Sequence, residues 1–529
     1  MDPFDPNLVA TLKSVFALVV PETVLVISAC TIFLGGTARS GRGLWGTAAL
    51  ISIAAAALAL AVGPRPDFAV LIPTVSPVWP DRLAFLTRIL ALVGGAALIL
   101  LSWDEVPDAQ AADLHGCLLL ITAGTSLVGS ANELITLFLA LELISIPTYV
   151  LLYLPRHDRP AREAAAKYFL LSIFSSGIVL FGFSYLYGVT GTTILPAIVE
   201  ALTSAESGGG GVPLLALVGI VMAVAGLGFR ITAVPFHFYA PDVYQGTATS
   251  AATLLAYLPK VAGFVALIRL LGDVPVTPTA VALAPESVLG GHVMLFLWIL
   301  AAITMTLGNV LALWQDNVQR ILAYSSIAHS GYMLIGLTVA TQYVGVARGA
   351  VPGGVEAVLF YLAAYGAMTV GTFGVLAVLN GTGRRIERVD DLAGLGRTHP
   401  GLGLLMTLFL FSLMGLPLTA GFAGKYFLFM GALAGPRTDA LSAGDQMGGL
   451  ARWLVLVAAI NTAIGAYYYL RIIGVMYLRG ALKPLARPQS IPGLTAVMVC
   501  ALLTLWLGIT PSGALKLAQA AATPVEVKR

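Results

Sequence analysis

The chain contains fourteen apolar stretches separated by short polar loops. A membrane-spanning helix needs about 20 mostly apolar residues to cross roughly 30 Å of hydrocarbon. Of the 529 residues 58% are hydrophobic and only 10% are charged, too few to cover a soluble globule of this size with polar surface. The sequence therefore predicts an all-α polytopic protein, a single integral membrane domain with spans at residues 14–35, 43–63, 82–102, 113–130, 132–154, 164–187, 213–235, 247–271, 291–314, 320–340, 355–380, 401–432, 452–478 and 491–510.

The basic residues of the loops are unevenly distributed. Loops that follow odd-numbered spans contain thirteen Lys and Arg residues, whereas loops that follow even-numbered spans contain three. The positive-inside rule makes the basic loops cytoplasmic, so both termini are predicted on the outer face. The net charge of +3, with no basic cluster interleaved with aromatic residues, gives no argument for nucleic-acid binding.

A carboxylate interrupts the fifth span. The stretch FLALELISIPTYVLLYL, residues 138–154, contains Glu142 as its only charged side chain. Because a charge at the bilayer centre costs at least about 2.5 kcal/mol, such a group is expected to be functional and to have a partner. Other ionisable residues in or beside the spans are the candidate partners: Lys167, Arg230, His237, Lys260, His329 and Lys425.

The seventh span carries Arg230 shortly before Pro235 and Pro241. Proline removes a backbone donor and disfavours helix at the preceding residue, so we predict that this span is broken. A broken membrane helix is tolerated where it lines a cavity, and its freed carbonyls can hold water beside Arg230 and His237. The alternative is a structural kink at which Arg230 reaches toward the membrane surface.

Two lysines lie within apolar spans. Lys260 follows Pro259 in span 8, and Lys425 follows Pro417 in span 12. Burial disfavours the ammonium form, so a buried lysine can release and recover a proton. Both are therefore candidate proton carriers, with a fixed structural ion pair as the alternative for each.

Further ionisable groups extend this series. Lys167 follows Glu163 by four residues, the favourable order for a helical pair, but could also be an interfacial anchor. His329 lies in the middle of span 10, where imidazole suits a relay or a structural hydrogen bond. Glu22 is predicted to be structural, and Arg88 could neutralise an acid. Water between the groups of the series could carry protons laterally, and no nucleophilic triad or metal-ligand cluster competes with this interpretation.

The sequence also repeats itself. A shift of 183 places lays the segment around Glu142 over RILAYSSIAHSGYMLIGL, and a shift of 182 lays VPFHFYAPDVY over LPLTAGFAGKY. Two separate segments thus indicate nearly the same offset. Repeated halves with proline-interrupted spans are typical of transporters.

Six motifs carry a family resemblance: ELITLFLALELISIPTYVLLYL, EAAAKYFLLSIFSSG, GLGFRITAVPFHFYAPDVYQG, TMTLGNVLALWQDNVQRILAYSSIAHSGY, FSLMGLPLTAGFAGKYFLF and NTAIGAYYYLRIIGVMY. With these motifs the chain resembles, over nearly its whole length, the antiporter-like membrane subunits of respiratory complex I, specifically the subunit N family of NADH-quinone oxidoreductase. The segment AATLLAYLPKVAGF after span 7 favours subunit N over the sister subunits L and M.

The resemblance implies fourteen helices with two inverted five-helix repeats, spans 4–8 and 9–13, and broken helices 7 and 12. Residues 1–110 would form an N-terminal three-helix segment, 111–271 the first antiporter-like repeat, 291–478 the second repeat, and 479–529 a C-terminal helix and tail. It further implies that Lys260 is the central lysine of a proton path and Lys425 its outlet-side lysine. Lys167 and His237 fall on polar positions of the first half-channel.

By the same resemblance Glu142 and Arg230 occupy the family's glutamate and lysine pair. The family motif usually reads GLGFK, whereas this chain has GLGFR. Arginine stays protonated, so Arg230 cannot exchange a proton as lysine can. Our hypothesis is that protons load at Lys260 while Arg230 is a fixed charge that tunes Glu142.

The resemblance implies a proton-translocating subunit of a multi-pass complex in the bacterial plasma (inner) membrane, coupled to quinone reduction elsewhere. No cofactor is expected in this subunit, because FMN, iron–sulfur clusters and quinone belong to partner subunits. The expected partners are other membrane-arm subunits, including the sister antiporter-like subunits and the small membrane subunits, with the peripheral redox arm acting indirectly. Three alternatives remain: a stand-alone or Mrp-type cation/proton antiporter subunit, the equivalent subunit of a ferredoxin- or hydrogenase-linked complex, and a non-transporting scaffold.

Overall fold

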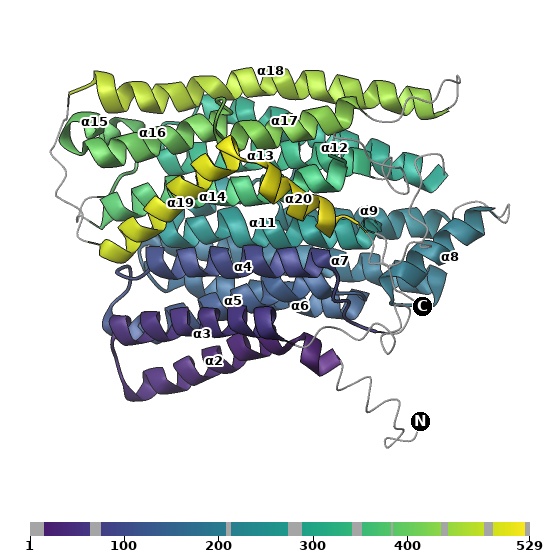
Figure 1. Cartoon of the computed structure of the whole chain (residues 1–529), viewed down its shortest axis with the longest axis horizontal. Helices are drawn as coiled ribbons and strands as arrows, with labels where there is room; N and C mark the ends of the chain where they lie inside the picture. Colours follow the sequence, from purple (N-terminus) through teal and green to yellow (C-terminus); the bar gives the residue numbers. More distant parts are fainter. Residues whose placement is uncertain are drawn as a thin grey trace.

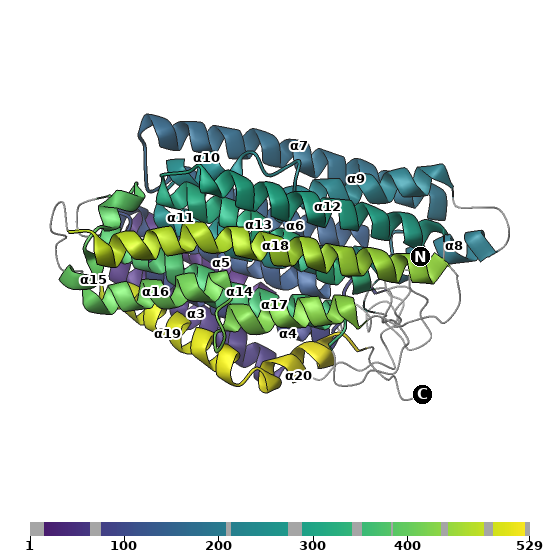
Figure 2. The same ribbon diagram turned by 90° about the horizontal axis from the view of Figure 1, so that it is seen from above.

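The computed structural model describes residues 15–63, 76–207, 213–272, 274, 288–340, 352–381, 385–434, 443–480 and 490–523. Apart from three isolated β-bridges, the regular structure of these residues is helical. Most helices lie side by side along the long axis of the molecule, and the view from above shows the same arrangement (Figures 1 and 2). The predicted all-α architecture is confirmed.

The long helices coincide with the predicted spans, although many ends differ by several residues. In the part of the chain that the structure describes, eleven helices are long and apolar enough to cross a membrane, and shorter apolar helices accompany them. Helices α8, α10, α15 and α20 lie outside the predicted spans. The α-helices are α2 (Val20–Ala38), α3 (Arg42–Val62), α4 (Arg82–Leu101), α5 (Ala111–Ser130), α6 (Leu134–Tyr153), α7 (Arg159–Thr190), α8 (Leu195–Ser207), α9 (Leu214–Arg230), α10 (Ala240–Gly246), α11 (Thr249–Leu271), α12 (Val288–Leu313), α13 (Val318–Ala340), α14 (Gly354–Asn380), α15 (Leu395–Thr398), α16 (Pro400–Met414), α17 (Ala420–Leu433), α18 (Ala443–Leu478), α19 (Ile491–Ile509) and α20 (Ser512–Ala521).

Spans 7 and 12 are broken, as predicted. Helix α9 ends at Arg230, five residues before the predicted end, because the chain turns through Thr232 (φ +57°) and the Ala233 N–H donates back to the Gly228 carbonyl at 2.8 Å. Helix α16 ends before Gly415, whose φ of +95° favours glycine. The interruptions leave carbonyl groups free within the bundle, and α10 and α17 follow them.

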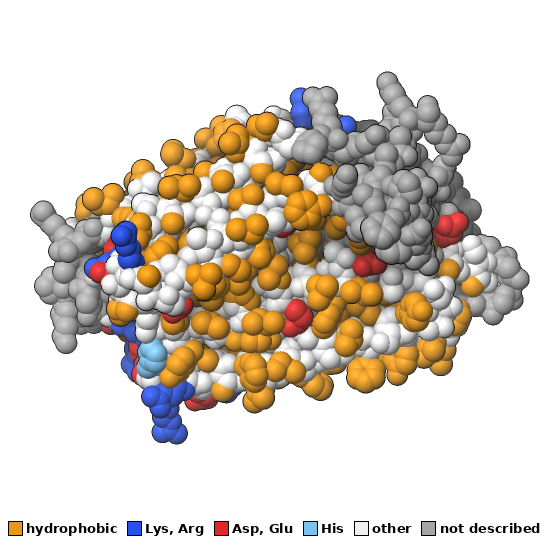
Figure 3. All heavy atoms as spheres, turned by 90° about the horizontal axis from the view of Figure 1, so that it is seen from below, with side chains coloured by type: hydrophobic (Ala, Val, Ile, Leu, Met, Phe, Trp, Pro, Cys, Tyr) orange, Lys and Arg blue, Asp and Glu red, His pale blue; other side chains and the backbone are white. Residues whose placement is uncertain are grey.

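The core of the bundle is unusually enclosed around α11, since all 23 of its residues are buried. The neighbouring helix α14 is buried over most of its length. On the face seen from below, apolar side chains predominate, and most of the visible Lys and Arg side chains lie toward one end (Figure 3). Large apolar side chains of α6 and α7 such as Leu139, Ile146 and Phe174 are exposed, as expected for a surface that faces lipid or neighbouring membrane helices.

Buried ion pairs attach the N-terminal helices to this core. Glu22 of α2 accepts hydrogen bonds from Arg88 Nε at 2.7 Å and from Ser126 Oγ at 2.5 Å. Asp81, at the start of α4, forms a two-bond pair with Arg269 near the end of α11, with both N–O distances 2.6 Å. Helix α4 is thus fastened to the central helix α11 by a fixed charge pair.

Candidate functional site

Glu142 and Arg230 meet between α6 and the end of α9. Arg230 Nη2 lies 3.5 Å from Glu142 Oε1 and donates to Ser145 Oγ at 2.5 Å. Ser176 Oγ donates to the same carboxylate oxygen at 2.6 Å. The Arg230 side chain is 5% exposed and that of Glu142 is 24% exposed. The distance between the two charged groups is therefore long, and each of them also has a hydrogen bond to a serine hydroxyl. Small side-chain movements can open or close such an ion pair.

Lys167 occupies a separate position near the basic end of the bundle. Its Nζ lies 2.7 Å from both Glu163 and Asp242, the latter on α10. Arg320 approaches the other Asp242 oxygen at 2.6 Å, and a cavity of about 190 Å³ adjoins the group. Lys167 is nine residues, or about 14 Å, along α7 from Ser176, which contacts Glu142. Asp242 was missed by the sequence analysis, although it lies within the quoted segment PDVYQG.

His237 lies in the unwound segment between α9 and α10. Its Nδ1 is buried and has no hydrogen-bond partner among the described residues. The segment is held by Tyr239, whose hydroxyl donates to the Phe229 carbonyl at 3.0 Å and whose ring stacks on that of Phe229. His237 thus lies beside the break, as the sequence predicts. Among the described residues, no hydrogen bond or ion pair joins it to Glu142 or Arg230.

Lys260 lies at the centre of α11 and is fully buried. Its Nζ donates to the Ser326 carbonyl of α13 and, at 2.7 Å, to Ser330 Oγ. The ring of Tyr365 is 5.5 Å away. Within the described ranges Lys260 forms no ion pair. The alternative, that Lys260 belongs to a fixed structural ion pair, therefore lacks an acidic partner among these residues. A charged amine without a counter-ion is costly in a dry interior, which suits Lys260 to exchange its proton.

His329 continues the polar groups on α13. It lies between Ser326 and Ser330 in sequence, with Nδ1 2.6 Å from the Tyr361 hydroxyl and Nε2 3.1 Å from the Tyr469 hydroxyl. These tyrosines belong to α14 and α18. Both ring nitrogens therefore have a hydroxyl neighbour that can donate or accept, the geometry needed to pass a proton on without moving the ring.

Lys425 follows the second helix break. Its Nζ donates to the carbonyls of Leu413 and Met414, at 3.1 and 3.0 Å, which the end of α16 leaves free. The ammonium also lies 4.9 Å from the ring centroid of Tyr332 on α13. The Tyr332 hydroxyl accepts from Asn309 at 3.1 Å. The structure thus brings Lys260, His329 and Lys425 together around α13, with serine and tyrosine hydroxyls between them.

A further acid outside the spans contacts the helix that carries Lys260. Glu105, between α4 and α5, accepts hydrogen bonds from the Ser250 hydroxyl and, at 3.3 Å, from the Ser250 backbone N–H in the first turn of α11. Burial raises the pKa of Glu105 to about 7, although the Ser250 N–H opposes this shift. Glu105 lies in a polar loop, so its sequence context does not mark it as a candidate.

The raised pKa of Glu105 predicts a specific pH dependence. Between about pH 4.5 and 7 the folded protein holds this proton more tightly than the unfolded chain, so stability relative to Glu105→Gln should fall as pH rises through that window. In infrared difference spectra, a protonated carboxyl band lost in Glu105→Gln should titrate near pH 7. A midpoint near pH 4.5 would show that the carboxyl is not desolvated.

Comparisons with known proteins agree with this architecture. Residues 131–443 match the family described as NADH:quinone oxidoreductase/Mrp antiporter, TM. The chain is 38% identical to NADH-quinone oxidoreductase subunit N of Trichlorobacter lovleyi over 83% of each chain. It is 34% identical to subunit N 2 of Rhizobium meliloti over 95% of this chain and 97% of that relative.

Solved structures give the same result. A chain of respiratory complex I from Thermus thermophilus with bound aureothin has a TM-score of 0.72 and 28% identity, covering 94% of this chain and 99% of that chain. A chain of the Mrp complex from Dietzia shares the fold, with a TM-score of 0.76 at 18% identity, over 96% of this chain and 97% of that one. The resemblance inferred from the motifs is confirmed: the chain belongs to the NADH:quinone oxidoreductase/Mrp antiporter family and, within it, to the subunit N group.

Proposed function

We propose that this chain is a proton-translocating membrane-arm subunit of a respiratory NADH:quinone oxidoreductase, and that protons cross it through the buried ionisable groups. The observation that carries the proposal is Lys260, fully buried, without an ion pair in the described residues, and hydrogen-bonded to the helix of His329. Chemical energy would come from quinone reduction in partner subunits, which hold the flavin, iron–sulfur clusters and quinone.

In the proposed path Lys260 takes up a proton and passes it toward His329. Ser330 lies 2.7 Å from Lys260, and the imidazole has the hydroxyls of Tyr361 and Tyr469 on its two sides. Transfer toward Lys425 needs water between these hydroxyls and the ammonium. At the break after α16, backbone carbonyls that lack a helical partner accept hydrogen bonds from Lys425. These polar groups support a proton outlet at that point.

The Glu142–Arg230 pair would control when Lys260 loads. Arginine keeps its charge, so the pair acts by separation and not by proton exchange. Its separation of 3.5 Å and the competing hydroxyls of Ser145 and Ser176 support such a switch. Lys167 and Asp242 at the basic end, with His237 at the break, would form the first half-channel.

The environment of Glu142 supports neighbouring membrane subunits as partners. Its side chain is 24% exposed on α6, the helix that also exposes Leu139 and Ile146, and a charge facing lipid is costly. We therefore assign this side to contact with a sister antiporter-like or small membrane subunit. The proposed location is the bacterial inner membrane, with both termini outside and repeats at residues 111–271 and 291–478.

The role of Arg230 is tested by comparing Arg230→Lys with Arg230→Met in the assembled complex. Vesicles supplied with NADH and quinone should show the wild-type proton-to-electron ratio for Arg230→Lys, because the positive charge beside Glu142 is kept. Arg230→Met should lower the ratio, since the partly exposed Glu142 carboxylate within the span then lacks its counter-charge. Wild-type pumping by Arg230→Met would contradict the switch.

A further inference from the structure

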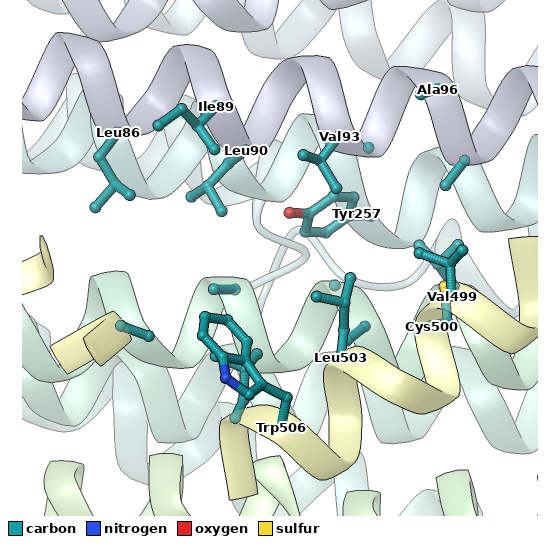
Figure 4. A pocket seen from close by; sticks show the side chains of 18 of the residues that line it. Leu86, Ile89, Leu90, Val93, Ala96, Tyr257, Val499, Cys500, Leu503 and Trp506 are labelled. Atoms are coloured by element: carbon teal, nitrogen blue, oxygen red, sulfur yellow. The ribbon is translucent and has the colours of Figure 1, made fainter. Parts of the chain in front are cut away.

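An apolar cavity of about 340 Å³ lies between α4, α11, α14, α19 and α20. Figure 4 shows Leu90 and Val93 of α4 facing Leu503 and Trp506 of α19 across the cavity, with Tyr257 of α11 between them. Its volume falls in the range of small-molecule sites, about 300–1,000 Å³. No residue of the proposed proton path lines it, so this cavity needs a separate explanation.

The cavity opens on the outer surface of the bundle. Three residues that line it, Val499, Trp506 and Leu517, are about half exposed. The opposite wall belongs to α14, where Ala367 is buried and Ala363 only partly accessible. A molecule that enters between α19, α20 and α4 therefore reaches a wall that bulk lipid does not touch.

The side chains that line the cavity indicate what kind of molecule could bind there. The lining side chains are almost all aliphatic or aromatic, so water would find too few hydrogen-bond partners to remain. An empty space of this size would forfeit dispersion contacts along its walls. Because the mouth lies on the exposed apolar surface of the bundle, the acyl chain of a lipid is apolar material that can enter it.

An exposed cation precedes one of the mouth residues in the sequence. Lys516 is exposed on α20, next to Leu517, and forms no ion pair in the part of the chain that the structure describes. Lysine binds phosphate as a point charge, and near the membrane surface it attracts anionic lipids. We propose that the cavity is a binding site for an anionic phospholipid, with one acyl chain between α4, α14 and α19 and the phosphate near Lys516.

The site touches the helix that carries Lys260. Tyr257 lines the cavity one turn before Lys260, and its ring packs so closely on Gly94 and Gly366 that a Cβ at either position would come within 2.6 Å of it. A bound acyl chain would complete the packing around this ring. The lipid thus stabilises the position of α11 without taking part in proton transfer.

Photolabelling of the assembled complex tests the site. The probe is a phosphatidylglycerol with a diazirine at the end of one acyl chain, and labelled residues are identified by mass spectrometry. We expect label on Ala363 or Ala367 of α14, and a loss of that label of at least about fivefold in Ala363→Phe, which fills the cavity. Ala57→Phe, on the exposed face of α3, is the matched control and should label α14 as wild type does.

The headgroup is tested separately. Lys516→Gln should remove the preference for the anionic probe over a phosphatidylcholine probe with the same diazirine chain. Label confined to the exposed face of α19, at Leu502 or Leu505, with none on α14, would overturn the site. The same result accompanied by cross-links from α14 to another subunit would show that a protein helix occupies the cavity instead. Equal labelling of wild type by the two probes would refute the role of Lys516.

Discussion

Arg269→Met should destabilise the protein by about 3–5 kcal/mol, the cost typical of leaving one member of a buried ion pair without its partner. The two N–O distances to Asp81 are 2.6 Å, and both side chains are at most 5% exposed. Asp81 also caps α4 by accepting the Ala84 N–H at 2.8 Å. Loss of Arg269 therefore leaves a buried carboxylate where α4 and α11 are joined. Thermal unfolding of the purified complex measures the effect.

The exposed pair of Arg479 and Asp390 provides the control. Arg479→Met should change stability by no more than about 1 kcal/mol, as is usual for surface pairs. The double variant Asp81→Asn/Arg269→Met should be more stable than Arg269→Met alone, because the unpaired charge is gone. If Arg269→Met and Arg479→Met behave alike, the Asp81–Arg269 pair does not hold α4 to α11.

His329→Leu should lower proton translocation by at least about tenfold while the complex still assembles, since a positioned acid–base group typically contributes a hundredfold or more. The two ring nitrogens of His329 lie 2.6 Å from the Tyr361 hydroxyl and 3.1 Å from the Tyr469 hydroxyl. Leucine can neither donate nor accept a hydrogen bond at this position. Proton uptake per electron transferred, in sealed vesicles without uncoupler, is the measurement, and the electron-transfer rate is read separately with an uncoupler.

His292→Leu is the matched control, because this histidine is exposed on α12 and its ring nitrogen Nδ1 is hydrogen-bonded to the Val288 carbonyl of its own helix. It should pump as wild type does. Normal pumping by His329→Leu would show that protons bypass the α13 imidazole, and that its hydrogen bonds are structural.

Much of the fold could be predicted from sequence because membrane spans and their breaks are local properties. Runs of apolar residues set the helices, and Pro235 and Gly415 lie where spans 7 and 12 lose their helical geometry. Helices α8 and α20 escaped prediction because they are too short to span a membrane. Lys260, Arg230 and Lys425 could be found for a similarly local reason, since a charge in an apolar stretch is conspicuous.

The partners of these charges could not be predicted, because they come from distant segments. Tyr469 is 140 residues from His329, and Asp242 is 75 residues from Lys167. Tyrosine and serine are common in apolar helices, so their positions carry no signal until the helices are packed. Glu105 was missed for the opposite reason, since an acid in a loop is ordinarily solvated.

In the proposed path Lys260 carries the translocated proton. The most direct measurement is the proton-to-electron ratio of vesicles containing the assembled complex, compared between wild type and Lys260→Ala during NADH oxidation by quinone. We expect a lower ratio for Lys260→Ala in a complex that contains all its subunits and still transfers electrons. An unchanged ratio would mean that protons do not pass through Lys260, and would favour a subunit that supports the complex without moving protons through this residue.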